Sequence, residues 1–251
     1  GYSIQPSEFV KFTLLICLAA IFSQEEKRDI KNLLLVGIPA FFLVVFEPDF
    51  GTASVIIALC LVLYFISGAK IKNLLLLSLF ISLLGILFIV IFPYRRKRVA
   101  ALLNPFFDPL GDSYHAYQIV LTLASGGLFG RGIGESRQKY QYLPQVTTDS
   151  IMAVVGEELG FLGLTFFILL LILLVWLCFK VAKNKNDLFA KLIAAGVGSW
   201  LAIQGMLNLS SIAILLPFTG IPFPLISYGG SSLLAIMAAV GVLINVNRNS
   251  K

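Results

Sequence analysis

General-base catalysis is the chemistry for which this sequence offers the most candidate residues. It contains a single histidine, His115, so a Ser-His-Asp triad would depend entirely on that residue. No Walker loop is present, and Gly130-Arg131-Gly132-Ile133-Gly134 is not a dinucleotide-binding fingerprint. A general base is therefore expected to be a carboxylate. The carboxylates that lie away from the basic connections of the chain are Glu8, Glu47, Asp49, Asp108, Asp112, Glu135, Asp149, Glu157 and Glu158.

Asp149 has the best setting among these carboxylates. It follows Pro144-Gln145-Val146-Thr147-Thr148 and stands where a loop turns into a long apolar helix. One interpretation is a helix N-cap, a position that Asp fills well. The other is a catalytic base, which the helix dipole would keep ionised and would also make weak. The spacing leaves both interpretations open.

Four further charged residues fall within apolar runs. Glu157 and Glu158 lie about two turns beyond Asp149, and adjacent residues face different directions on a helix, so at most one can share a cavity with it. Carboxylates inside a membrane are functional candidates by default, and salt bridging inside the bundle is the alternative. Glu8 and Lys11 are three residues apart and so share a helix face. We interpret them first as a structural ion pair and second as part of a polar cavity.

Two motifs could line the same cavity. Glu47-Pro48-Asp49-Phe50-Gly51 is a sharp turn, in which Asp49 either caps the following helix or faces the cavity. Ser227-Tyr228-Gly229-Gly230-Ser231-Ser232 opens the last apolar run, where small residues allow close helix packing. Alternatively, the amides at this helix start face an anion, which makes Tyr228 and Ser231 candidate substrate contacts.

A basic cluster, Tyr94-Arg95-Arg96-Lys97-Arg98, begins directly after a long apolar run. In one interpretation these four cations belong to a solvated loop. In the other they form an anion site for a phosphate at the level of the lipid headgroups, because Arg offers a planar fork and Lys a point charge.

The composition indicates what must position these side chains. Hydrophobic residues make up 58% of the 251 residues and charged residues 13%, against about 45–50% and about 25% in soluble domains. The apolar runs are long and continuous, which favours membrane-spanning helices over a β-barrel. The sequence therefore predicts an all-α, polytopic transmembrane helix bundle, with residues 1–251 forming a single integral-membrane domain. Seven spans are expected, at Pro6–Phe22, Leu33–Phe46, Thr52–Ser67, Leu74–Phe92, Ser150–Phe179, Leu188–Leu209 and Ser227–Val246.

Basic residues in short connections predict the orientation of the chain in the membrane. The short connections on one side, at residues 47–51 and 217–226, contain no Lys or Arg. The other connections and the C-terminal tail are therefore expected in the cytoplasm, and the segment at about 93–149 outside the cell. An odd number of spans with an outside start suggests that spans upstream of Gly1 are missing. The basic residues of the cytoplasmic set are Lys27, Arg28, Lys31, Lys70, Lys72, Lys180, Lys183, Lys185, Lys191, Arg248 and Lys251.

Five segments, in this order along the chain, resemble motifs of the SEDS family (FtsW/RodA/SpoVE-like). Gln5–Lys11 is similar to the QPSE-x-x-K opening of its fourth span, and Glu47–Thr52 to its P-D-[LF]-G-T turn. Ser136–Pro144 resembles the division-type SRQK-x-x-YLP stretch. Thr148-Asp149 with Gly156–Gly160 resembles the TDF and GEELG motifs, and Pro222–Ser232 resembles LPLPFISYGGSS. The resemblance covers essentially the whole chain, and the division (FtsW-like) type is favoured.

The resemblance implies an inverting glycosyltransferase with ten spans in the complete fold, so that about three are missing here. Its reaction would polymerise lipid II, an undecaprenyl-diphosphate-linked disaccharide peptide, at the outer face of the bacterial cytoplasmic membrane. The essential aspartate of the family maps onto Asp149, which would be the base. Ser150 departs from the TDF motif, where Phe is usual, and Val146-Thr147 replace a common Ala/Pro-His pair.

The departing lipid diphosphate needs cations, and Arg95, Arg96, Arg98 and Lys139 could supply them. A divalent cation (Mg²⁺ or Mn²⁺) could share this role, although no metal-ligand cluster in the sequence demands one. The resemblance also implies a class B penicillin-binding transpeptidase as partner, and no nucleic acid. The alternatives are a flippase or transporter for the lipid-linked precursor and a scaffold for the division machinery.

Overall fold

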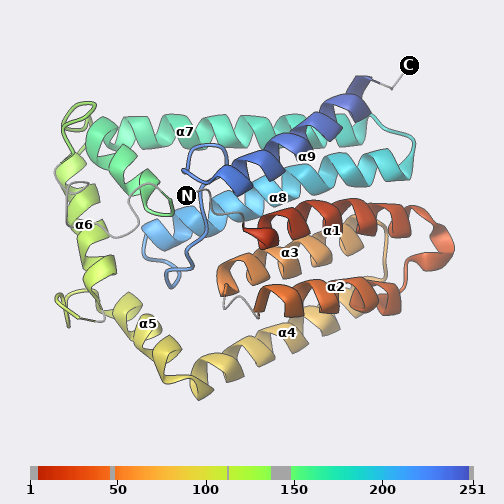
Figure 1. Ribbon diagram of the computed structural model, residues 1–251, viewed down its shortest axis with the longest axis horizontal. Helices are drawn as coiled ribbons and strands as arrows, with labels where there is room; N and C mark the ends of the chain where they lie inside the picture. Colours follow the sequence, from red (N-terminus) through yellow and green to blue (C-terminus); the bar gives the residue numbers. More distant parts are fainter. Residues whose placement is uncertain (1–4, 46–48, 112, 137–147, 249–251) are drawn as a thin grey trace. The chain divides into compact units, whose positions relative to one another are not determined.

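The computed structural model describes residues 5–45, 49–111, 113–136 and 148–248, and every regular element in these ranges is a helix (Figure 1). The all-α prediction is therefore confirmed. In chain order the elements are α1 (Pro6–Ser23), the 3₁₀ turn η1 (Glu25–Lys27), α2 (Ile30–Val45), α3 (Phe50–Ile66), α4 (Ile71–Ile91), α5 (Pro93–Leu103), α6 (Tyr114–Gly126), α7 (Ile151–Lys183), α8 (Leu188–Ile212) and α9 (Gly230–Arg248).

Seven apolar helices coincide with the seven predicted spans to within a few residues. Within the described ranges, α1, α4, α7, α8 and α9 are long and apolar enough to cross a membrane by length and composition. The helices α2 and α3 are apolar but shorter, in line with the shorter apolar runs at Leu33–Phe46 and Thr52–Ser67. The chain has the fold of a multi-pass membrane protein. The expectation of a single domain and of three missing spans stays a prediction.

The chain divides into two compact units. Unit 1 comprises residues 1–81, 172–204 and 229–251. In this unit α1 packs against α2, α3 and α9. Phe22 of α1 and Tyr64 of α3 meet with ring centroids 5.7 Å apart, and both are buried.

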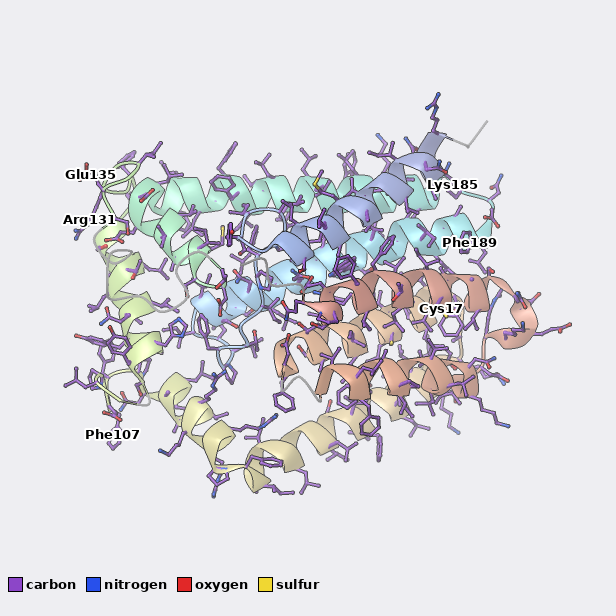
Figure 2. The ribbon with its side chains drawn as sticks, in the orientation of Figure 1. Cys17, Phe107, Arg131, Glu135, Lys185 and Phe189 are labelled. Carbon is purple, nitrogen blue, oxygen red and sulfur yellow. The ribbon has the colours of Figure 1, made fainter. Side chains whose placement is uncertain are left out.

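The basic connections of unit 1 lie at one end of it. Figure 1 shows the α1–α2, α3–α4 and α7–α8 turns and the end of α9 at the same end of the helices. In Figure 2, Lys185 and Phe189 mark the α7–α8 turn at this end, whereas Cys17 lies within α1. The predicted grouping of these basic connections on one side is therefore present within unit 1.

Unit 2 comprises residues 82–171 and 205–228. Its core is formed by residues of α6, α7 and α8 and of the segment after α8: Ile119, Met152, Ala153, Val154, Ile212 and Phe223.

Two helices, α5 and α6, occupy part of the segment predicted as an extracellular loop at about 93–149. The helix α5 starts with Pro93, which suits the first helical turn, and it ends before Asn104-Pro105, since a residue that precedes proline disfavours helix. The helix α6 ends at Gly126, and its C-cap residue Gly127 has a positive φ of 56°. Phe107 lies between these two helices (Figure 2). The cations of the basic cluster therefore stand on a helix instead of in an irregular loop.

The helix α7 bends at Gly160. This residue has φ 69° and ψ −167°, outside helical geometry. Main-chain bonds fasten the segment after α6 to the bend: Phe161 N donates to Gly127 O at 2.9 Å and Gly132 N to Glu158 O at 3.0 Å. A Cβ atom at Gly160 would lie 2.3 Å from the amide nitrogen of Gly130, so no larger residue fits there. The bend separates a short first segment, residues 151–159, from the long apolar remainder of α7.

Candidate active site

Asp149 lies in the turn directly before this first segment of α7. Its side chain is buried, with 3% of its surface exposed. The helix starts at Ile151, and the carbonyl of Ser150 accepts the amide hydrogens of Ala153 and Val154 at 3.0 and 3.4 Å. Ser150 therefore takes the N-cap position, since the carbonyl of an N-cap residue accepts the first helical bond. This geometry leaves Asp149 one residue outside the cap, with its carboxylate accepting a hydrogen bond from the Thr148 hydroxyl.

Asn208 of α8 holds the main chain at Asp149. Its side-chain amide donates to the carbonyl of Asp149 at 2.8 Å and to the carbonyl of Ile221 at 2.7 Å. A Cβ atom built on Gly220 would lie 3.6 Å from the carboxylate oxygen Oδ2 of Asp149. The segment after α8 therefore approaches the carboxylate closely. The sequence analysis does not single out Asn208, whose only signal is an amide side chain, like that of Gln204, within a long apolar run.

The surroundings of Asp149 make it a stronger base than an exposed aspartate. Burial raises the pKa of its carboxyl above the usual 3.8, against the opposing effects of the Thr148 hydroxyl, its own amide and the charge of Arg98. A raised pKa suits a proton acceptor, because general-base efficiency grows as the pKa approaches the working pH.

The basic cluster contributes Arg98 to this region. Its Nη1 donates to the carbonyl of Phe218 at 2.5 Å. A cavity of about 190 Å³ lies beside it, with Lys97, Arg98, His115 and Ser211 as polar lining and apolar side chains around them. Lys97, which belongs to the basic cluster but is not among the predicted diphosphate ligands, also lies on the cavity wall.

The other two arginines of the cluster do not line this cavity. Arg95 has its guanidinium 5.6 Å from the ring centroid of Phe92, and Arg96 is exposed. Neither observation tests their predicted role in holding a diphosphate, which stays a prediction.

Glu157 is fixed inside unit 2 by two serines. Its carboxylate accepts hydrogen bonds from Ser125 at 3.0 Å and from Ser136 at 2.5 Å, and the side chain is fully buried. Glu158 accepts the amide of Gly132 through its main-chain carbonyl. The structure thus assigns both residues contacts that fix the bend of α7 and the loop beside it.

A separate polar cluster lies in unit 1. Lys11 donates to Glu8 at 2.7 Å and to Gln204 at 3.0 Å, and its ammonium lies 5.4 Å from the ring centroid of Trp200. The indole of Trp200 donates to the same oxygen of Gln204 at 2.8 Å. Glu8 and Lys11 are buried and form the ion pair that their spacing predicts. Gln204 and Trp200 were not anticipated from the sequence.

Three other predicted site residues can be placed. Asp49 caps α3 by accepting the amide of Thr52 at 2.9 Å, and it also accepts from the side chain of Gln5 at 3.1 Å. Ser231, at the start of α9, accepts the amide of Gln5 at 2.9 Å. Tyr228 is 76% exposed. Lys139 and Glu47 lie outside the described residues.

The part of the chain that the structure describes contains no group of three or more His, Cys, Asp or Glu side chains that could hold a metal ion. The suggestion that Mg²⁺ or Mn²⁺ assists the reaction stays a prediction.

The fold and this site define an integral membrane protein with a buried carboxylate at the start of a bent span. A model of the family described as "Cell cycle protein" (FtsW/RodA/SpoVE) matches residues 1–251. The chain belongs to this family, the SEDS family. The membership predicted from the five motifs is therefore confirmed.

Relatives and solved structures match almost the whole chain. It is 42% identical to Stage V sporulation protein E of Bacillus subtilis, covering 100% of this chain and 70% of the relative. It is 36% identical to the probable peptidoglycan glycosyltransferase FtsW of Buchnera aphidicola, covering 98% of this chain and 67% of that relative.

Two solved structures share the fold. One belongs to work described as "Structural coordination of polymerization and crosslinking by a peptidoglycan synthase complex", with a TM-score of 0.79, 29% identity, and coverage of 98% of this chain and 70% of that one. The other is the rod shape determining protein RodA of Thermus thermophilus, with a TM-score of 0.66, 27% identity, and coverage of 98% and 66%.

Proposed function

We propose that this protein polymerises lipid II into glycan strands at the outer face of the cytoplasmic membrane, with Asp149 as the general base. The enzyme class follows from the family, because relatives that match nearly the whole chain are named probable peptidoglycan glycosyltransferases. Asp149 is assigned as the base because its carboxylate is buried, has a raised pKa and lies directly before the bent helix α7.

The reaction needs three events at one place. The acceptor sugar hydroxyl attacks the anomeric carbon of the donor, and a new C–O bond forms with inversion. Asp149 takes the hydroxyl proton, which requires the two oxygens to approach within hydrogen-bond distance. The bond from the anomeric carbon to the diphosphate breaks, and undecaprenyl diphosphate leaves with the electron pair.

The developing negative charge on the leaving diphosphate requires cations. Arg98 and Lys97 line the cavity beside His115 and Ser211. The positive charge of Arg98 also acts on the Asp149 carboxyl, whose pKa it lowers. This proximity supports a donor diphosphate near Arg98. In this scheme an arginine serves better than a lysine, because its fork can bind two phosphate oxygens at once.

The orientation and the partner belong to the same proposal. The basic end of unit 1 faces the cytoplasm together with the C-terminus, as the positive-inside rule favours. A class B penicillin-binding transpeptidase is the proposed partner, and one structural neighbour belongs to a peptidoglycan synthase complex.

The test is Asp149→Asn, assayed for strand synthesis from lipid II by the purified full-length protein. A carboxamide cannot accept the proton, so the rate should fall about 10²–10⁴-fold. Since burial of the ionised carboxylate is unfavourable, the folded variant should be at least as stable as the wild type at neutral pH. The matched control is Asp187→Asn, because Asp187 is exposed and accepts the amide of Ala190 at the start of α8. Asn fills that role equally well.

A polymerisation rate above about a tenth of the wild-type value would exclude Asp149 as the base. Normal activity of Asp149→Asn in lipid translocation, with no strand synthesis by the wild type, would instead favour the transporter alternative.

A further inference from the structure

The single histidine of this chain contacts the residue next to Asp149. Nε2 of His115, in α6, lies 3.0 Å from Oγ of Ser150 at the start of α7. Ser150 is fully buried and takes the N-cap position of α7. A hydrogen bond to the Ser150 side chain therefore also restrains the turn that contains Asp149.

The ring of His115 is itself held from its other side. It packs on the ring of Phe218, with centroids 3.8 Å apart and an interplanar angle of 43°. The carbonyl of Phe218 accepts the hydrogen bond from Arg98. Arg98 of α5, Phe218, His115 and Ser150 therefore form a continuous chain of contacts.

The charge state of His115 suits this role. Burial, together with the charge of Arg98, lowers the pKa of its imidazole to about 4. The ring is therefore neutral at pH 7, so that one nitrogen donates and the other accepts. A neutral ring also adds no positive charge beside Asp149, which would weaken the carboxylate as a base.

We infer that His115 is a positioning residue for Asp149, acting through its hydrogen bond to Ser150. The inference rests on the proposed function of Asp149 as base. Asn208 fixes the carbonyl of Asp149, and His115 fixes the side chain of the next residue, so the turn is held at two points. These two holds set the direction of the carboxylate, and small displacements of a reacting group reduce rates strongly.

The expected effect follows from the strength of one hydrogen bond. A net contribution of about 0.5–1.5 kcal/mol corresponds to roughly a 2- to 12-fold change in rate. We expect His115→Leu and Ser150→Ala each to lower kcat for lipid II polymerisation within this range, with KM unchanged. The double variant should be no slower than the slower single variant, because both changes remove the same bond. His115→Gln, which can still reach Ser150, should lie closer to the wild type than His115→Leu does.

The experiment measures kcat, KM and thermal stability on the same preparations of full-length protein. Ser199→Ala is the matched control: Ser199 is a buried serine that bonds only within α8, to the carbonyl of Ala195 at 2.7 Å. Its kcat should equal that of the wild type.

Four outcomes would overturn the positioning role. Normal kcat in His115→Leu would do so, as would single effects that multiply in the double variant. A rise in KM with normal kcat would make His115 a substrate contact of the cavity instead. A parallel loss of rate and stability, equal in the Leu and Gln variants, would make it a packing residue.

Asp149→Asn, run alongside, separates the two proposals. If that variant polymerises lipid II, the proposed base is wrong. If it is inactive while His115→Leu is normal, only the positioning role is wrong.

Discussion

The side-chain amide of Asn208 donates to the carbonyl of Asp149 at 2.8 Å, across 59 residues of sequence. The same amide nitrogen donates its other hydrogen to the carbonyl of Ile221. One buried side chain therefore fastens the turn before α7 to the segment after α8. Both amide hydrogens of Asn208 are thus bound by main-chain carbonyls. Its side-chain oxygen Oδ1 is buried without a hydrogen-bond partner among the described residues.

Replacing Asn208 should damage both stability and activity. In Asn208→Ala the two carbonyls lose their donor, and each buried unsatisfied group costs about 1–3 kcal/mol. Asn208→Asp keeps the shape but offers no hydrogen while ionised, so it should be at least as damaging. Thermal unfolding and strand synthesis measured on the same samples test this. A stable, active Asp variant would show that the two bonds contribute little.

The stability of the protein should depend on the titration of His115. The pKa of His115 in the folded state is about 4, against 6.5 for an unperturbed histidine side chain. Because the unfolded state binds the proton more readily, the contribution of His115 is present in full above pH 6.5 and is lost as the pH falls toward 4. His115→Gln should therefore lose less stability than the wild type between pH 7 and pH 4.5. Melting temperatures across this range check the expectation, and parallel curves for the two proteins would contradict it.

Arginine at position 98 should govern donor binding more than arginine at position 96. Arg98 lines the cavity, whereas Arg96 does not. Arg98→Gln should lower kcat/KM for lipid II several-fold, and Arg98→Lys should also lower it because the bidentate fork is lost. Arg96→Gln is the matched control of equal charge change. Equal effects at the two positions would indicate a diffuse electrostatic contribution instead of a binding site.

The buried ion pair of unit 1 should respond asymmetrically to substitution. Lys11→Met leaves the Glu8 carboxylate buried without its cation, and breaking a buried pair costs about 3–5 kcal/mol. Adding Glu8→Gln should recover part of this loss, since the uncompensated charge is then removed. Unfolding measurements on the single and double variants test the pair, and a double variant less stable than Lys11→Met would refute the explanation.

The orientation of the chain can be tested with single cysteines. After replacement of the exposed Cys17 by Ser, a cysteine at Lys70 should resist an impermeant thiol reagent in intact cells. One at Leu110, which is 93% exposed in the segment between α5 and α6, should react. The reverse pattern would overturn the placement of the basic connections in the cytoplasm.

The membrane helices could be predicted closely because each depends on local composition. A long apolar run must form a helix in a bilayer, where main-chain groups have no water to bond. Residues 93–126 were harder to predict, because α5 and α6 have mixed composition and no apolar run as long as a span. Their start and end signals, Pro93 and Gly127, are visible in the sequence but do not by themselves establish a helix between them.

The candidate site could be predicted only in part. The loop-to-helix position of Asp149 and the cations after α4 were visible in the sequence. Asn208, Phe218 and Gln204 were missed, since their roles come from contacts between segments far apart in the chain. The N-cap interpretation of Asp149 failed by one residue: Ser150 occupies the cap, and local spacing cannot decide between adjacent polar residues.

The main-chain fastening at the Gly160 bend has a consequence for how this protein can vary over evolution. Because amides and carbonyls hold the segment after α6 to α7, the side chains of Ile133 and Glu135 are left exposed; Figure 2 shows Glu135 at this edge of unit 2. Sequence drift at these positions would leave the bend unchanged, whereas drift at Gly130 or Gly160 would not. The exposed surface of this segment can therefore adapt to new neighbours while the bend of α7 is retained.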